Sequence, residues 1–148
     1  MLDHATHSSI SSLLAALVLI AMGTGCSAVD PASPNVVLNV QQVSVPNPLA
    51  PPAATVAVGR GSLDIAGYMT TPYPCYQLTA EAQQSGATLT VNLTAASTGS
   101  GCAAVITPFG FTAHVAQVSS STSHVRVQQT GAVSGFPTVL LDQDVAMP

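Results

Sequence analysis

Two histidines and two aspartates are the residues whose types could support metal binding or acid–base catalysis. His114 and His124 lie in the second half of the chain, and Asp142 and Asp144 lie near its end. The chain has neither a G-x-S-x-G sequence for a nucleophilic serine nor an H-E-x-x-H sequence for zinc. His114 alternates with apolar neighbours, which places it on the solvent face of a strand. We therefore expect solvated histidines, with no catalytic residue, metal or cofactor.

The same alternation places the other charged side chains outward. Arg126 lies between two valines, and Asp142 and Asp144 share one face of the predicted last strand. The two aspartates could meet Arg126, but an exposed ion pair contributes only ~0–1 kcal/mol.

Three tyrosines lie close together around a proline-rich segment. Tyr68, Tyr73 and Tyr76 flank or interrupt the sequence Thr-Thr-Pro-Tyr-Pro-Cys at residues 70–75. Tyrosines in an exposed loop are typical of recognition surfaces, whereas tyrosines at the edge of a β-structure also simply cover the core. Both interpretations stay open for these three residues.

Composition excludes several classes of function. The chain has 148 residues, only 5% of them charged, a formal net charge of −4 and two basic residues, Arg60 and Arg126. Binding to nucleic acid requires several Lys or Arg side chains to neutralise phosphates, so nucleic acid is excluded as a partner. A polybasic membrane patch is excluded for the same reason. Aromatic residues make up 4% with no Trp, which argues against a stacking platform for bases or sugars.

An apolar run near the N-terminus predicts export. Residues 13–22 (LLAALVLIAM) are uninterrupted and apolar, which is too short for a membrane span but matches the core of a signal peptide. The run is followed by Gly23-Thr24-Gly25-Cys26 and then by Ser, Asp, Pro and Asn residues. Small residues before a cysteine at this place resemble the lipobox of bacterial lipoproteins, although Gly23 replaces the usual large aliphatic residue and the preceding region has no Lys or Arg.

The lipobox resemblance implies a lipid anchor and a cleaved signal peptide over residues 1–25. In that family the cysteine sulfur, here that of Cys26, carries a diacylglyceryl group, and the new N-terminus is acylated. Several acyl chains give lasting membrane attachment without any basic patch. A serine after the cysteine, here Ser27, usually goes with outer-membrane sorting in Gram-negative bacteria. The alternatives are ordinary cleavage, for example after Ala28, which gives a secreted protein, and a buried apolar helix.

Export also predicts a disulfide. If Cys26 is lipidated, Cys75 and Cys102 are the remaining cysteines, and exported proteins fold in an oxidising compartment. A Gly-Ser-Gly loop directly before Cys102 allows the chain to return to Cys75. A redox pair would favour Cys-x-x-Cys and a metal site would need more ligands, so we expect a structural disulfide.

The remainder of the chain predicts a tether followed by strands. Residues 26–54 are rich in proline, which favours an extended spacer, and residues 36–45 could add one edge strand. From residue 55 onward, apolar and polar residues alternate in short runs separated by Gly, Ser and Pro. Ser85-Gly86 between two such runs predicts a hairpin, with the following opposite pairs: Leu78–Leu93, Ala80–Val91 and Ala82–Leu89.

These patterns predict an all-β fold. We expect residues 55–148 to form an antiparallel β-sandwich of about five to seven short strands. The architecture resembles an immunoglobulin-like sandwich, without a sequence hallmark of that family.

The function expected from the sequence is non-enzymatic. We expect an exported, lipid-anchored cell-envelope protein with a binding or structural role, attached to the membrane through its lipid and contacting a protein or cell-wall partner. The alternative is a secreted inhibitor or chaperone-like binding domain, and a hydrolase is a remote third possibility.

Overall fold

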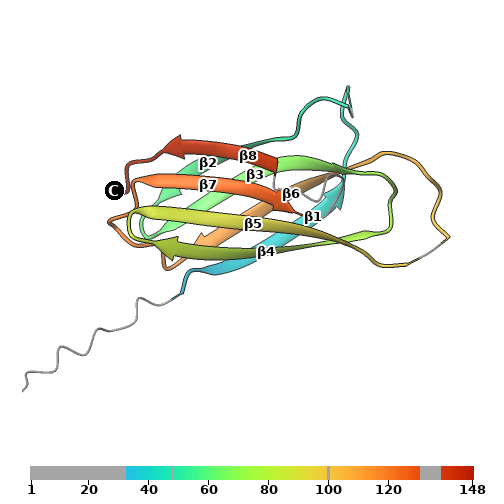
Figure 1. Cartoon of the computed structure of the whole chain (residues 1–148). Helices are drawn as coiled ribbons and strands as arrows, with labels where there is room; N and C mark the ends of the chain where they lie inside the picture. Colours follow the sequence, from blue (N-terminus) through green and yellow to red (C-terminus); the bar gives the residue numbers. More distant parts are fainter. Residues whose placement is uncertain (1–32, 48, 100, 131–137) are drawn as a thin grey trace, which may run out of the picture.

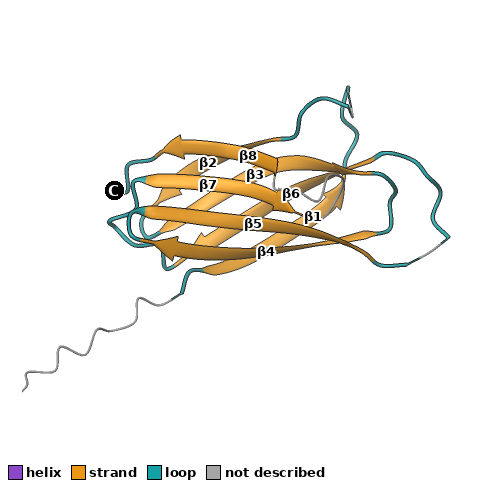
Figure 2. Ribbon diagram, viewed as in Figure 1, coloured by secondary structure: helices purple, strands orange, loops and turns teal. Residues whose placement is uncertain are grey.

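Eight strands make up most of the part of the chain that the structure describes (Figures 1 and 2). The structure is a computed structural model that describes residues 33–47, 49–99, 101–130 and 138–148. The strands in these ranges are β1 (Asn35–Gln42), β2 (Ala53–Gly59), β3 (Ser62–Thr71), β4 (Tyr76–Ser85), β5 (Thr88–Ser97), β6 (Thr107–Ala116), β7 (His124–Thr130) and β8 (Thr138–Asp144). Within the same ranges, no helix is long and apolar enough to cross a bilayer. Cys26 and the expected signal peptide lie outside the described residues.

The strands form two four-stranded sheets that pack face to face. One sheet has the order β1-β6-β3-β2, which we call sheet A, and the other has the order β4-β5-β7-β8, which we call sheet B. The predicted all-β sandwich is therefore confirmed. The segment expected to add an edge strand does so as β1, which pairs antiparallel with β6.

One pair of neighbouring strands is parallel, which the expected antiparallel arrangement did not include. β5 and β7 run in the same direction in sheet B. The reason lies in the order of the chain: β6, which separates them in sequence, crosses to sheet A. Two successive reversals of direction bring β7 back beside β5 with the same orientation.

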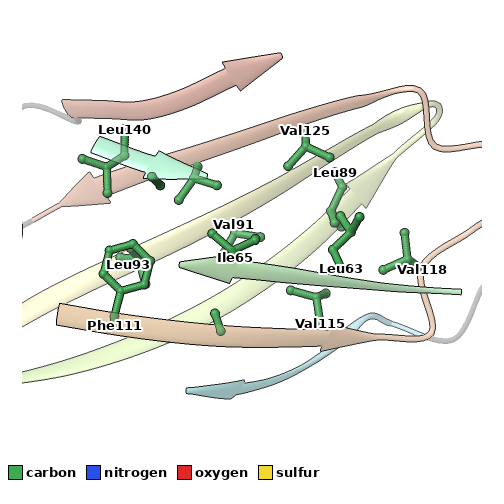
Figure 3. Close-up of a cluster of buried hydrophobic side chains, with 13 residues drawn as sticks. Leu63, Ile65, Leu89, Val91, Leu93, Phe111, Val115, Val118, Val125 and Leu140 are labelled. Atoms are coloured by element: carbon green, nitrogen blue, oxygen red, sulfur yellow. The ribbon is translucent and has the colours of Figure 1, made fainter. Parts of the chain in front are cut away.

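Alternating apolar residues fill the space between the sheets (Figure 3). The most deeply buried members come from both sheets: Leu63, Ile65, Leu89, Val91, Leu93, Val115, Val125 and Val127. Each fully buried side chain of this size stabilises the fold by roughly 1.5–3 kcal/mol. A second cluster of four buried residues extends the core beneath Tyr76: Met69, Leu78, Ala95 and Phe109.

The predicted β4–β5 hairpin is present, but its predicted register is wrong by two residues. Ser85 and Thr88 face each other, so the turn consists of Gly86-Ala87. Gly86 has a φ of 56°, and a turn with glycine at its first central position matches the right-handed twist of a hairpin. The actual pairs are Leu78–Ala95, Ala80–Leu93 and Ala82–Val91. Because the error is an even number of residues, every side chain keeps its predicted face.

The two ends of the sandwich differ in chemistry. β1 begins at the end that also holds the tight β2–β3 and β4–β5 turns, which we call the turn end (Figure 1). The opposite end, the loop end, holds the described residues of the three loops at 43–52, 72–75 and 98–106. No Asp, Glu, Lys or Arg occurs in these three loops. The charged residues of the strands all lie nearer the turn end: Asp64, Glu81, Arg126, Asp142 and Asp144.

Candidate functional site

A histidine held between two aspartates lies at the turn end of sheet B. β7 and β8 pair antiparallel, with His124 opposite Asp144 and Arg126 opposite Asp142. His124 Nδ1 lies 2.8 Å from Asp144 Oδ1, and His124 Nε2 lies 2.5 Å from Asp142 Oδ1. Arg126 Nε lies 3.7 Å from Asp142 Oδ2. The predicted approach of Arg126 to an aspartate is confirmed for Asp142. No sequence motif pointed to His124 as the centre of the cluster.

The geometry of this cluster favours a protonated imidazole. Both ring nitrogens of His124 face carboxylate oxygens, and both can donate only when the ring is protonated. The hydrogen bond to Asp144, followed by the one to Asp142, raises the pKa of His124 above its ordinary value. The ring stands between the carboxylates, and no group of His, Cys, Asp and Glu in the described ranges is arranged to hold a metal ion. The cluster is therefore an ion-pair network at the end of sheet B.

The protonation of His124 gives a testable dependence of stability on pH. A raised pKa in the folded state means that the contribution is fully present below the unfolded value, about 6.5, and is lost as pH rises through the folded pKa. We expect the free energy of unfolding to decrease between pH 6 and 8.5, and His124→Gln to reduce that decrease. Urea unfolding at pH 6 and at pH 8.5 measures this decrease. Asp144→Asn is a second variant, and we expect it to reduce the decrease as well. Equal pH dependence in the wild type and His124→Gln would contradict the assignment.

His114 points to solvent, as expected, and pairs with Asp64 across sheet A. The two residues face each other on β6 and β3, with His114 Nδ1 2.7 Å from Asp64 Oδ1. Both side chains are more than half exposed. The pairing joins residues 50 positions apart, so only knowledge of the strand order could have predicted it.

The predicted disulfide joins Cys75 to Cys102 at the loop end. The Cα atoms lie 6.2 Å apart, within the range that a disulfide spans. Next to this bond the Thr98 backbone N–H donates to the Cys75 carbonyl oxygen at 3.0 Å. The disulfide and this hydrogen bond together tie the β3–β4 and β5–β6 loops to each other.

Two of the three predicted tyrosines lie beside the disulfide. The ring centroids of Tyr73 and Tyr76 are 4.8 Å apart, and the Tyr73 hydroxyl donates to Ser97 Oγ at 3.2 Å. Hydrogen bonds with Ser97 and Tyr76 lower the pKa of Tyr73. The hydrogen bond with Tyr73 raises the pKa of Tyr76. Tyr68 lies apart from this pair, in β3, where its hydroxyl donates to the Pro51 carbonyl oxygen at 3.0 Å.

The apolar run at residues 103–106 predicts a short strand, and this prediction is wrong: the run lies in the exposed loop after the disulfide. Residues 103–106 (Ala-Ala-Val-Ile) are all exposed, with 59% of Val105 and 47% of Ile106 accessible to solvent. The Val105 N–H donates to the Ala103 carbonyl oxygen, and the Thr107 hydroxyl donates to that of Val105, each at 2.8 Å. Natural proteins seldom expose a run of apolar residues without a function for it.

Comparisons with protein-family models, with curated proteins and with solved structures found no match to this chain. The candidate sites therefore depend on the geometry and chemistry of the chain itself.

Proposed function

We propose that this protein is an exported, lipid-anchored cell-envelope protein whose β-sandwich binds a partner protein through its loop end, without catalysing a reaction. The signal-peptide-like residues 13–22 and the lipobox-like sequence ending at Cys26 support export and lipidation. The observation that carries the binding role is the contrast between the two ends of the sandwich. β1 begins at the charged turn end, whereas the uncharged loop end exposes Leu49, Val105 and Ile106.

A lipid at Cys26 would leave the loop end free to meet a partner. The chain between Cys26 and the start of β1 can extend to about 30 Å at most, and Pro31 and Pro34 stiffen it. The tether joins the sandwich at the turn end, so the loop end lies farthest from the point of attachment. The partner would meet Val105 and Ile106 in a loop already fixed by the disulfide, which reduces the entropy lost on binding.

The histidines favour a binding role over hydrolysis. Both ring nitrogens of His124 contact aspartates, which leaves neither nitrogen free to accept a proton from a nucleophile. Among the described side-chain hydrogen bonds, His114 contacts Asp64 rather than a serine or cysteine. The alternative of a secreted inhibitor or chaperone-like domain would use the same loop end but would lack the lipid.

Cross-linking in intact cells tests this proposal. We expect the wild type to remain in the membrane fraction and to capture a partner, and Cys26→Ser to leave that fraction. Val105→Ser/Ile106→Ser should retain the anchor and reduce capture of the same partner at least tenfold.

Val139→Ser is the matched control, because Val139 is a similarly exposed valine, 41% accessible, on β8. It should capture as well as the wild type. A Cys26→Ser protein that stays in the membrane fraction would contradict the anchor. Capture that is unaffected by Val105→Ser/Ile106→Ser would contradict the loop-end surface.

A further inference from the structure

The outer face of sheet A is hollowed along β6. Two adjoining hollows with volumes of about 490 and 420 Å³ share Asn39, Ala66 and Thr112. Volumes of this size fall within the range of small-molecule sites, and both hollows are open to solvent. The first hollow extends toward Tyr68 and Gln41, and the second extends toward Asp64 and His114.

The segment after β1 forms one wall of the first hollow. The Val43 N–H donates to the Pro108 carbonyl oxygen at 3.1 Å, and Val43 lies against Gly110, where a Cβ atom would come within 2.7 Å of its side chain. The hydrogen bond from the Tyr68 hydroxyl to the Pro51 carbonyl oxygen holds the far end of the same β1–β2 connection against the sheet. The wall is therefore fixed at both ends by contacts with the sheet.

Some polar side chains on the outer face of sheet B bond to one another, whereas three in the hollow of sheet A do not. On sheet B, Gln128 Nε2 donates to Asn92 Oδ1 at 2.6 Å. The hydroxyl oxygens of Thr94 and Thr130 share a hydrogen bond at 3.2 Å. In the hollow, the side chains of Asn39, Gln41 and Thr112 have no hydrogen bond to another described residue. Two amides and a hydroxyl are therefore free to bind a ligand.

The charge of the hollow limits the class of ligand. Its lining includes one carboxylate, Asp64, which is paired with His114, and contains no Lys or Arg. An anionic ligand would find no basic side chain to pair with it, and a cationic ligand would compete with His114 for a single carboxylate. A neutral ligand rich in hydroxyl groups matches amides and hydroxyls, which both donate and accept.

We propose that this face of sheet A binds a neutral oligosaccharide. Asn39, Gln41 and Thr112 would bond its hydroxyl groups, the Asp64 carboxylate would accept a further one, and Tyr68 would contact its apolar face. Scarcity of aromatic residues excludes a row of stacking rings, so binding depends on hydrogen bonds beside a single ring. The distance from Gly110 to His114 along β6 is roughly 14 Å, which suits a short oligosaccharide. This site adjoins the loop end at Val43 but does not include Val105 or Ile106, and it is independent of the lipid anchor.

Nuclear magnetic resonance on the full chain in mild detergent tests the site. The probes are cellohexaose, maltohexaose and hexa-N-acetylchitohexaose, with hexagalacturonic acid as the charged comparison. We expect at least one neutral probe to shift the side-chain amide signals of Asn39 and Gln41, and the charged probe to bind at least tenfold more weakly. Shifts confined to sheet B, no response to any neutral probe, or equal binding of the charged probe would overturn the proposal.

Substitutions in the hollow separate binding from folding. Ala66→Phe should fill the hollow and abolish binding, and Thr112→Val should weaken it about fivefold through loss of one hydrogen bond. Thr79→Val makes the same change on an exposed position of β4 in sheet B and should bind as the wild type does. Equal weakening by Thr112→Val and Thr79→Val would overturn the assignment. Neither result affects the proposed anchor, which membrane fractionation tests independently.

Discussion

Replacing both Cys75 and Cys102 by serine is expected to lower the free energy of unfolding by about 3–4 kcal/mol. The disulfide spans 27 positions of sequence, and closing a loop of that length in the unfolded chain removes conformational entropy of about this value. The bond also joins two loops whose described residues are exposed or half-buried. Its loss should therefore loosen the loop end more than the turn end.

Denaturant unfolding of the oxidised wild type and of Cys75→Ser/Cys102→Ser measures the difference. Cys26→Ser serves as the control for removing a cysteine that forms no part of the bond, and we expect it to change the free energy of unfolding by no more than about 0.5 kcal/mol. Hydrogen exchange should show faster exchange at the Thr98 amide, which bonds to Cys75. A decrease below 1 kcal/mol in the double variant would contradict the stabilising role.

Gly67→Ala is expected to destabilise the protein by about 1–3 kcal/mol. Replacing glycine by alanine inside a strand ordinarily gains roughly 0.5–1 kcal/mol, so the expected effect has the opposite sign. A Cβ atom at Gly67 would lie 2.5 Å from the Ala53 carbonyl oxygen and 2.9 Å from Phe111 Cζ. The first neighbour is backbone and the second is a buried ring, so neither can move without disturbing β2 or the core.

Thermal or urea unfolding measures this change, with Gly99→Ala as the matched control. A Cβ atom at Gly99 would meet nothing within 4 Å, so that variant should be neutral or slightly more stable. Adding Phe111→Leu to Gly67→Ala should relieve the contact with the ring but not the one with Ala53. Equal or greater stability of Gly67→Ala would show that β2 and β3 can separate at this point without cost.

Local patterning was sufficient to predict the strands but not their arrangement. The alternation at Leu89, Val91 and Leu93 identified a half-buried strand, because side-chain direction in a strand depends only on sequence parity. The hairpin register missed by two because the turn was centred on Ser85-Gly86, whereas Gly86 occupies the first turn position. The parallel β5–β7 pair required knowing that β6 joins the opposite sheet, which is a property of the whole core.

In the candidate sites too, some features could be predicted from local sequence, and others depend on how the strands are arranged. The cysteine count and the expectation of export were enough to predict the Cys75–Cys102 bond. Neighbouring strands near the end of the chain brought Arg126 close to Asp142, as expected. The pairing of Asp64 with His114 depends on the order of β3 and β6, and the hollow beside it depends on how residues 43–52 lie against sheet A.

The few charged residues of the described strands lie near one end of the sandwich and leave the other end uncharged. Ion pairs gather at the turn end around His124, whereas the loop end exposes Val105 and Ile106 without a charged neighbour in its three loops. An uncharged end suits a partner surface that also lacks charge. The proposed attachment at the turn end would present this surface outward.

Mass spectrometry of the N-terminal peptide of the mature protein, purified from membranes, tests the proposed anchor most directly. We predict a chain that begins at Cys26 and carries a diacylglyceryl group on sulfur and an acyl group on the new amino terminus. The same peptide should be missing from cells that express Cys26→Ser. An unmodified N-terminus, whether at Met1 or after Ala28, would contradict the proposal that this sandwich is held at the membrane by a lipid.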